Sequence, residues 1–222
     1  MKVGTDAVLL GAWSDIQGAK KILDIGTGSG VIALMLAQRS DADSHVDAIE
    51  LLGQDAKQAA ENVAASAWSL KISVIHTALQ DFWPATRYDL ILCNPPYFSG
   101  SLLPPGESRS VARHDQALEQ SELISAVERL LSPVGRFCVI LPAAGGELFI
   151  QLSESRKLFL HRHTRFFSRT QKPQERSLFE FRFDFHKVDE DILVLYDSGD
   201  RWTEEYARLT HDFYLDRSSL NR

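Results

Sequence analysis

The sequence predicts an α/β fold in which a mostly parallel β-sheet lies between two layers of helices. Along most of the 222 residues, short apolar runs alternate with segments of helical periodicity, and strands that alternate with helices form parallel sheets. Near the end of the chain, two apolar runs follow one another without a helix between them. We therefore expect a three-layer arrangement whose mostly parallel sheet ends in this pair of strands.

The expected strands are short runs of Val, Ile, Leu and Phe with polar residues on either side. They lie at 21–25, 45–49, 71–76, 88–93, 134–141, 157–166 and 176–186. Apolar residues at helical spacing predict helices at 5–13, 30–39, 53–66, 119–132, 145–154 and 203–215. The segment 94–118 is polar and contains Pro and Gly. A long loop at the ligand edge of a sheet usually holds or covers substrate.

Length and composition fit a single domain that spans residues 1–222. A hydrophobic content of 44% is enough for one sizeable core. The chain has no apolar run of about 18 residues and no apolar signal core, so we expect a cytoplasmic protein without membrane contact. Cys93 and Cys138 lie in apolar strand patterns and are expected to be buried thiols. The histidines show no ligand spacing with the cysteines, so we expect no metal.

The tetrapeptide Asn94-Pro95-Pro96-Tyr97 follows the apolar strand 88–93. Neither proline has an N–H and each fixes its φ angle, so the turn is rigid and offers acceptors rather than donors. Asn94 Oδ1 and the Pro95 carbonyl can hold the hydrogens of a planar amine while Tyr97 stacks on its ring. The amine lone pair then points at an electrophile. A turn that only closes a loop explains Pro-Pro, but not this tetrapeptide after a buried strand.

A glycine-rich segment follows the first predicted strand, in the run Leu-Asp-Ile-Gly-Thr-Gly-Ser-Gly, and its glycines are Gly26, Gly28 and Gly30. Glycines at this position allow a tight strand-to-helix turn and close approach of a ligand. Asp24 before the turn would repel a pyrophosphate but suits an ammonium group. Glu50, about 20 residues after the glycines, is placed to accept ribose hydroxyls.

These features predict a nucleoside site without a phosphate cradle, and S-adenosylmethionine fits it. The alternative is an NAD-binding half of a Rossmann fold, which shares the strand, loop, helix and acid. The G-x-G-x-G spacing and Asp24 favour the methyl donor. Asn94-Pro95-Pro96-Tyr97 at the same sheet edge would place the acceptor site beside the donor site.

The chain resembles class I S-adenosylmethionine-dependent methyltransferases that act on planar amines. Within this class it is similar to the bacterial tRNA1(Val) (adenine-37-N6)-methyltransferase family. The resemblance covers nearly the whole chain and is carried by residues 1–13, 23–30, 33–39, 94–97 and 206–215. It implies a Rossmann-like sheet of seven strands, mostly parallel, with one antiparallel strand. Family members usually carry a short aromatic-rich segment before Lys-Val-Gly-Thr-Asp, so we expect that this sequence lacks that segment.

The resemblance also implies which residues contact S-adenosylmethionine. They are Thr5, Asp6, Asp24, Gly26, Gly28, Gly30, Glu50, Asp81 and Asn94. The assignment of Asp81 is indirect, because the family's Asp at the end of the third strand falls on Leu79 here. We give its role to Asp81, with Gln80 as the alternative.

On the acceptor side, the resemblance implies a tRNA anticodon loop whose adenine flips into the pocket. Tyr97 and Phe98 would stack on the base, and Asn94, Pro95, Pro96 and Tyr97 would form the catalytic turn. Arg109, Arg113 and His114, in the loop after this turn, would contact the flanking phosphates. An alternative for this loop is that Asp115 caps the helix at 119–132. We expect the proton to leave to solvent and the protein to act as a monomer.

The net charge of −6 argues against a generic nucleic-acid binder, but the charge is uneven. Residues 156–187 hold nine Lys or Arg residues against three acidic ones, which is the footprint of a phosphate-contacting face. A solvated pair of strands explains the same pattern equally well. Phe159, Phe166 and Phe167 within it are expected in the core rather than as base-stacking platforms.

Other functions stay open at this point. Methyltransferases of rRNA, DNA adenine and protein glutamine share the Asn-Pro-Pro-Tyr motif. The DNA enzymes usually add a target-recognition domain, and the glutamine enzymes add an N-terminal helical domain, for which this chain has no room. A non-catalytic RNA-binding module with a vestigial donor site is disfavoured by the intact Asp24, Glu50, Asn94 and Tyr97.

Overall fold

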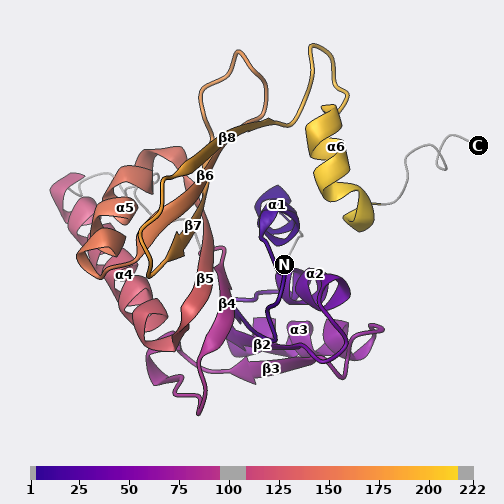
Figure 1. Ribbon diagram of the computed structural model, residues 1–222. Helices are drawn as coiled ribbons and strands as arrows, with labels where there is room; N and C mark the ends of the chain where they lie inside the picture. The colour runs from indigo at the N-terminus through magenta and orange to yellow at the C-terminus, as the bar shows by residue number, and fades with distance from the viewer. Residues whose placement is uncertain (1–3, 96–108, 215–222) are drawn as a thin grey trace, which may run out of the picture.

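The computed structural model describes residues 4–95 and 109–214, with the backbone alone at 109–118. The described chain forms one eight-stranded sheet with helices on both faces (Figure 1). The strands are β1 Lys21–Ile25, β2 His45–Glu50, β3 Ile72–His76, β4 Tyr88–Cys93, β5 Leu131–Pro142, β6 Phe159–Phe167, β7 Arg176–Arg182 and β8 Asp189–Val194. Their order across the sheet is β3-β2-β1-β4-β5-β7-β6-β8.

All strands of the sheet run parallel except β7. It pairs antiparallel with both β5 and β6, while β6 and β8 pair parallel. The prediction of a mostly parallel sheet with one antiparallel strand is therefore confirmed. The predicted strand count of seven is wrong by one, because β8 extends the sheet beyond β6. This strand begins Asp-Glu-Asp, and those three residues are exposed at the sheet edge, so its sequence lacks the apolar run that marks a buried strand.

The helices are α1 Thr5–Trp13, α2 Val31–Arg39, α3 Gly53–Ala64, α4 Arg109–Leu130, α5 Gly146–Ser155 and α6 Glu204–Thr210. In Figure 1, α4 and α5 lie on one side of the sheet, and α1, α2, α3 and α6 lie on the other. Each face has its own core. On β1, Ile22 belongs to the core under α1 and α2, while Leu23 belongs to the core under α4 and α5. Burial on both faces explains why β1 and β4 are mostly apolar rather than alternating apolar and polar.

The largest correction concerns the predicted loop 94–118. Helix α4 begins at Arg109 rather than 119 and runs to Leu130. After Gly106 the sequence has no Gly or Pro until Pro133 and is rich in Ala, Leu, Glu, Gln and Arg, which favour helix over loop. Asp115 therefore lies within the helix, and a capping role at 119 is wrong. Strand β5 follows α4 directly, at Leu131.

The C-terminal elements are shorter than predicted. Strand β7 ends at Arg182, and α6 ends at Thr210 before a 3₁₀ turn at His211–Phe213. Thr203 caps α6, since its side-chain oxygen accepts a hydrogen bond from Tyr206 N at 3.2 Å. Among the helices that the structure describes, none has the length and apolar character needed to cross a membrane.

Candidate active site

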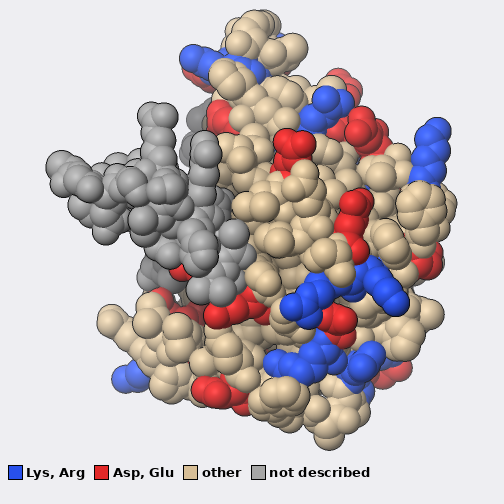
Figure 2. Space-filling view, turned by 90° about the vertical axis from the view of Figure 1, so that its left-hand side faces the viewer, with Lys and Arg blue, Asp and Glu red and all other residues tan. Residues whose placement is uncertain are grey.

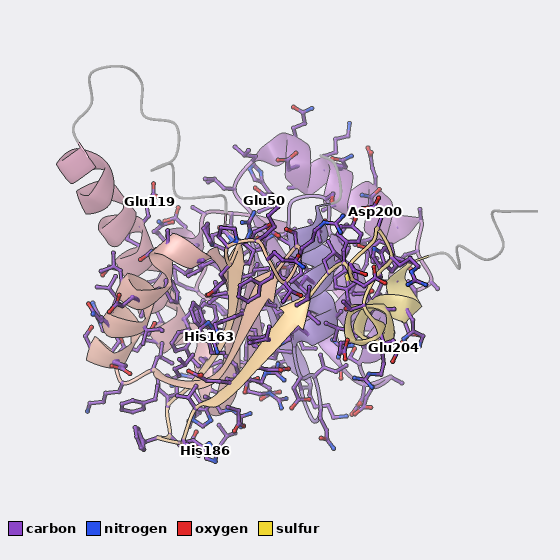
Figure 3. All side chains as sticks on the ribbon, turned by 90° about the horizontal axis from the view of Figure 1, so that it is seen from above. Glu50, Glu119, His163, His186, Asp200 and Glu204 are labelled. Atoms are coloured by element: carbon purple, nitrogen blue, oxygen red, sulfur yellow. The ribbon has the colours of Figure 1, made fainter. Side chains whose placement is uncertain are left out.

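A cavity of about 970 Å³ lies at the carboxyl edge of the parallel strands, where sheets of this type bind ligands. Its walls come from the segments that follow β1, β2, β3 and β4, and from the start of α1. The middle of α4 and the ends of β6 and β8 add further wall residues. In Figure 3, Glu50 and Glu119 lie toward this edge, whereas His186 lies at the opposite side of the molecule. The volume is at the upper end of the range for small-molecule sites.

The glycine segment forms a tight loop around the floor of the cavity. Gly26, Gly28 and Gly30 have φ angles of 69°, 56° and 84°, in the left-handed region that favours glycine. Gly26 and Gly28 line the cavity, but Gly30 does not. A Cβ on Gly30 would lie 3.5 Å from the Ala59 backbone of α3. That distance is ordinary van der Waals contact, so the left-handed φ rather than the space beside α3 favours glycine at 30, and its contact with a ligand stays a prediction.

Asp24 lies behind this loop rather than on the cavity wall. It is fully buried, and Oδ2 accepts hydrogen bonds from Thr27 Oγ1 at 2.5 Å and Ala33 N at 3.2 Å. Its Oδ1 is buried without a hydrogen-bond partner among the described residues. Burial raises the pKa of this carboxyl to about 7. Asp24 thus holds the loop, and its predicted contact with a ligand ammonium group stays untested.

Glu50 ends β2 and lines the cavity, as the sequence suggested. The residue is 7% exposed. Its Oε2 accepts a hydrogen bond from Gly28 N, and its Oε1 accepts one from Leu52 N, both at 2.9 Å. Each carboxylate oxygen retains acceptor capacity for a further bond. The side chain is therefore fixed in orientation and able to accept two hydroxyl groups of a ligand.

Asn94 and Pro95 follow β4 directly and line the same cavity. Both are partly buried. Pairing of β4 with β1, in which Ile25 lies opposite Cys93, brings the turn next to the glycine loop. The two motifs therefore line one cavity, as predicted, and their roles as acceptor and donor sites stay predictions. The other expected members of the turn, Pro96, Tyr97 and Phe98, lie outside the described residues.

The start of α1 closes one side of the cavity. Thr5 and Asp6 both line it, so the structure brings them to the predicted site. Asp6 Oδ2 accepts a hydrogen bond from Arg176 Nε at 2.8 Å. Arg176 and two apolar residues, Phe166 and Leu195, also line the cavity. Sequence reasoning missed these three, because only the reversed β7 and the extra β8 bring the C-terminal third to this edge.

The segment after β3 presents Leu79 and Gln80 to the cavity, but not Asp81. Asp81 is exposed, so the geometry favours the alternative, Gln80, over Asp81 at this wall. Gln80 Nε2 donates a hydrogen bond to Glu122 Oε2 of α4 at 2.9 Å. Glu119 and Glu122 line the cavity too, and no motif in the sequence marks them as site residues.

Arg109 and Arg113 lie on the first turns of α4, as does His114, and not in a loop as expected. Their side chains are outside the described residues, so their contact with a substrate stays a prediction. Cys93 and Cys138 are buried free thiols, as predicted, and burial raises the pKa of each. No cluster of three or more metal-ligating side chains occurs in the part of the chain that the structure describes.

The fold and this site define a methyltransferase with a class I fold. Residues 3–142 match the family model described as methyltransferase small domain. The fold is similar to that of a crystal structure described as a predicted O-methyltransferase from Agrobacterium tumefaciens. The TM-score is 0.75 and the sequence identity 18%, over 93% of this chain and 96% of that chain.

Proteins of similar sequence identify the family within this class of methyltransferases. The chain is 41% identical over 215 residues to a tRNA1(Val) (adenine(37)-N6)-methyltransferase of Aeromonas salmonicida, covering 97% of this chain and 91% of the relative. It is 42% identical over 221 residues to the protein of the same name from Bacteroides fragilis, with the same coverage. The chain belongs to the tRNA1(Val) (adenine(37)-N6)-methyltransferase family, and its methyl donor is S-adenosylmethionine.

The residues of the cavity fit this donor. Glu50 can hold the ribose hydroxyls, and the glycine loop leaves room for the nucleoside. Behind the loop, and not on the cavity wall, the buried Asp24 Oδ1 has no partner among the described residues, and a ligand ammonium group or an ordered water would satisfy such an atom.

Proposed function

We propose that this protein methylates N6 of adenine 37 in the anticodon loop of a tRNA, as a monomer in the cytoplasm. The observation that carries the proposal is the position of Asn94 and Pro95 on the cavity that Glu50 and Gly28 also line. The name of relatives about 40% identical over 97% of this chain, tRNA1(Val) (adenine(37)-N6)-methyltransferase, supports the adenine and the tRNA.

The acceptor groups of the turn select a planar amine. The Asn94 amide oxygen and the Pro95 carbonyl can each accept one hydrogen of an exocyclic amino group, which fixes the nitrogen with its lone pair toward the donor side of the cavity. The donor supplies a methyl group that is already activated on a sulfonium. Orientation of this kind can contribute up to roughly 7–11 kcal/mol in well-oriented systems, so no further activation of the amine is required.

The cost of unstacking the target base favours a base in a loop over a paired one. A base in a loop is less costly to unstack than a paired one, and sequence-specific RNA recognition targets such regions. Tyr97 and Phe98 would stack on the base. As the N–C bond forms and the S–C bond breaks, the nitrogen loses one proton. Glu119 and Glu122 on the same cavity wall are exposed and can pass it to solvent.

The proposal is tested by mixing the protein with radiolabelled S-adenosylmethionine and tRNA from cells that lack the matching activity, then digesting the RNA to nucleosides. We expect label in N6-methyladenosine, at one anticodon-loop position. Label in another nucleoside, or labelling of protein or DNA but not tRNA, would overturn the proposed substrate. If the donor binds but no methyl group is transferred to tRNA, the chain has the family's fold but does not carry out the proposed reaction.

A further inference from the structure

A cluster of basic and aromatic side chains surrounds the C-terminal end of α4, away from the cavity. We call it the α4 basic patch and define it by Trp83, Arg87, Arg129, Arg156 and Lys157. Figure 2 shows Lys and Arg side chains gathered on the lower half of the face that α4 and α5 cover. Arg129 contacts Trp83, while Arg156 bonds to Glu128 at the end of α4 and Arg87 bonds to Leu131 at the start of β5.

Arg129 and Trp83 form the centre of this patch. The guanidinium carbon of Arg129 lies 3.9 Å from the centre of the Trp83 ring, a cation–π contact. Arg129 also donates to Phe82 O at 2.7 Å and Leu79 O at 3.4 Å. These bonds use two of its five N–H donors. Trp83 nevertheless remains 73% exposed, so a large apolar ring faces solvent over a partly buried, fixed cation.

Three further cations extend the patch. Arg156 pairs with Glu128 of α4 at 3.1 Å, with side chains 46% and 43% exposed, and such exposed pairs are weak. Arg87 donates to Leu131 O at 3.5 Å and is exposed. Lys157 is exposed and has a φ of 60°, which turns the chain after α5. When Glu128, Glu154 of α5 and the exposed Asp81, two residues before Trp83, are counted against its four cations, the patch keeps a net charge of +1.

Five of the seven other cations of the basic segment predicted from the sequence form ion pairs within the protein, while Lys172 and Lys187 are exposed. The ion pairs join Arg162 and Arg182 to Glu180, Arg165 to Glu190, Arg169 to Asp200 and Arg176 to Asp6. Phe166 is buried, as expected. The cavity itself is lined by acids, among them Glu119, Glu122 and Glu175. A phosphate backbone is repelled by this rim and attracted by the α4 basic patch.

We propose that the α4 basic patch binds the phosphates of the RNA stem next to the methylated loop. The proposal rests on the proposed function, since it takes the loop base to be in the cavity. Glu119 on the cavity wall and Arg129 in the patch are ten residues apart on one helix, which corresponds to about 15 Å along its axis. One stem-loop can therefore reach both sites. Arg87, Arg129, Arg156 and Lys157 contact phosphates, and Trp83 packs against the sugar edge.

The test compares binding of an unmodified anticodon stem-loop and of a single-stranded oligonucleotide with the loop sequence, over a range of salt. The main variant is Arg87→Gln/Arg156→Gln/Lys157→Asn, because Asn tolerates the left-handed backbone at 157. We expect the stem-loop dissociation constant to rise about tenfold or more, and the salt slope to fall by about 2 to 3, roughly 0.9 per phosphate contact. Binding of the single strand should change less than twofold.

The matched control is a pair of single substitutions. Arg156→Gln removes one exposed cation of the patch, and Lys57→Gln removes one from α3, where Lys57 forms a similarly weak pair with Glu61. Only Arg156→Gln should lower the salt slope, by about one. Equal slopes for both variants, or an unchanged slope in the triple variant, would overturn the proposal. Donor affinity measured by calorimetry should match wild type in all of them, which shows that the cavity is intact.

The wild-type reaction separates this proposal from the proposed function. If wild type forms no N6-methyladenosine on the stem-loop, the proposed function fails, while the salt slopes still decide whether the patch binds RNA stems. If wild type forms N6-methyladenosine and the triple variant binds the stem-loop as tightly as wild type, only the role of the patch is refuted.

Discussion

Substitution of Asp24 by Asn is expected to stabilise the free protein while weakening donor binding. The carboxyl is fully buried, and one of its oxygens has no hydrogen-bond partner among the described residues. Asn keeps an oxygen that accepts from Thr27 and Ala33 and removes the buried charge. The change is nearly isosteric, so it tests the cost of that charge rather than the packing around it.

The magnitude follows from the pKa. Burial raises the pKa of Asp24 from 3.8 to about 7, and each unit corresponds to about 1.36 kcal/mol. Between these two pH values the folded protein holds a proton that the unfolded chain has lost, so the free energy of unfolding falls as pH rises toward 7. Above pH 7 the ionised carboxylate destabilises the free protein by up to about 4 kcal/mol. The Asp24→Asn variant has no carboxyl at this position, so its free energy of unfolding should not show this loss as pH rises.

The assay is urea unfolding of wild type and Asp24→Asn at pH 5 and pH 8, without donor. We expect the variant's advantage in unfolding free energy to be larger at pH 8 by about 2 kcal/mol or more. Donor affinity should fall about tenfold to a hundredfold, as for loss of a hydrogen bond to a charged group. An advantage that does not change with pH, or a variant less stable at pH 8, would refute the assigned burial cost.

Two further substitutions test one contact of the cavity wall and one contact that joins α1 to β6. Glu50→Ala removes the acceptor of Gly28 N and Leu52 N, so we expect a loss of about 1–3 kcal/mol in unfolding free energy and donor binding too weak for calorimetry. A donor affinity within a few-fold of wild type would contradict the role of Glu50. Trp13→Phe removes the 2.8 Å hydrogen bond from Trp13 Nε1 to the buried Thr164 Oγ1. Thermal unfolding should show a loss of about 1–2 kcal/mol, with donor affinity unchanged; an unaltered melting temperature would show that the bond contributes nothing.

The parts of the fold that could be predicted are those in which one local rule decides the outcome. Strands β1 and β4 are buried on both faces, so their sequences are mostly apolar on both faces, with Asp24 as the buried exception in β1. Gly26, Gly28 and Gly30 adopt left-handed angles that only glycine enters readily. From these features the sequence alone predicts that the glycine loop and the turn after β4 lie at one edge of the sheet, where the cavity is found.

The parts that could not be predicted depend on tertiary contacts. Strand β8 gains its place by pairing with β6 at the sheet edge, which its acidic start does not signal. Arg176 reaches the cavity because β7 is reversed, and it pairs with Asp6, 170 residues earlier. The start of α4 was missed because Pro and Gly before 107 suggested that the loop continued. In each case the sequence shows the residues, but it does not show the tertiary contact or the extent of the element that decides where they lie.

The most direct measurement compares donor binding and single-turnover methyl transfer in wild type and Asn94→Ala. If Asn94 orients the acceptor amine, transfer to tRNA should fall by about 10² or more, while the donor dissociation constant measured by calorimetry stays within about threefold of wild type. If the two quantities instead fall together, Asn94 serves donor binding or the fold of the cavity, and the assignment of the turn after β4 as the amine-holding catalytic site is contradicted.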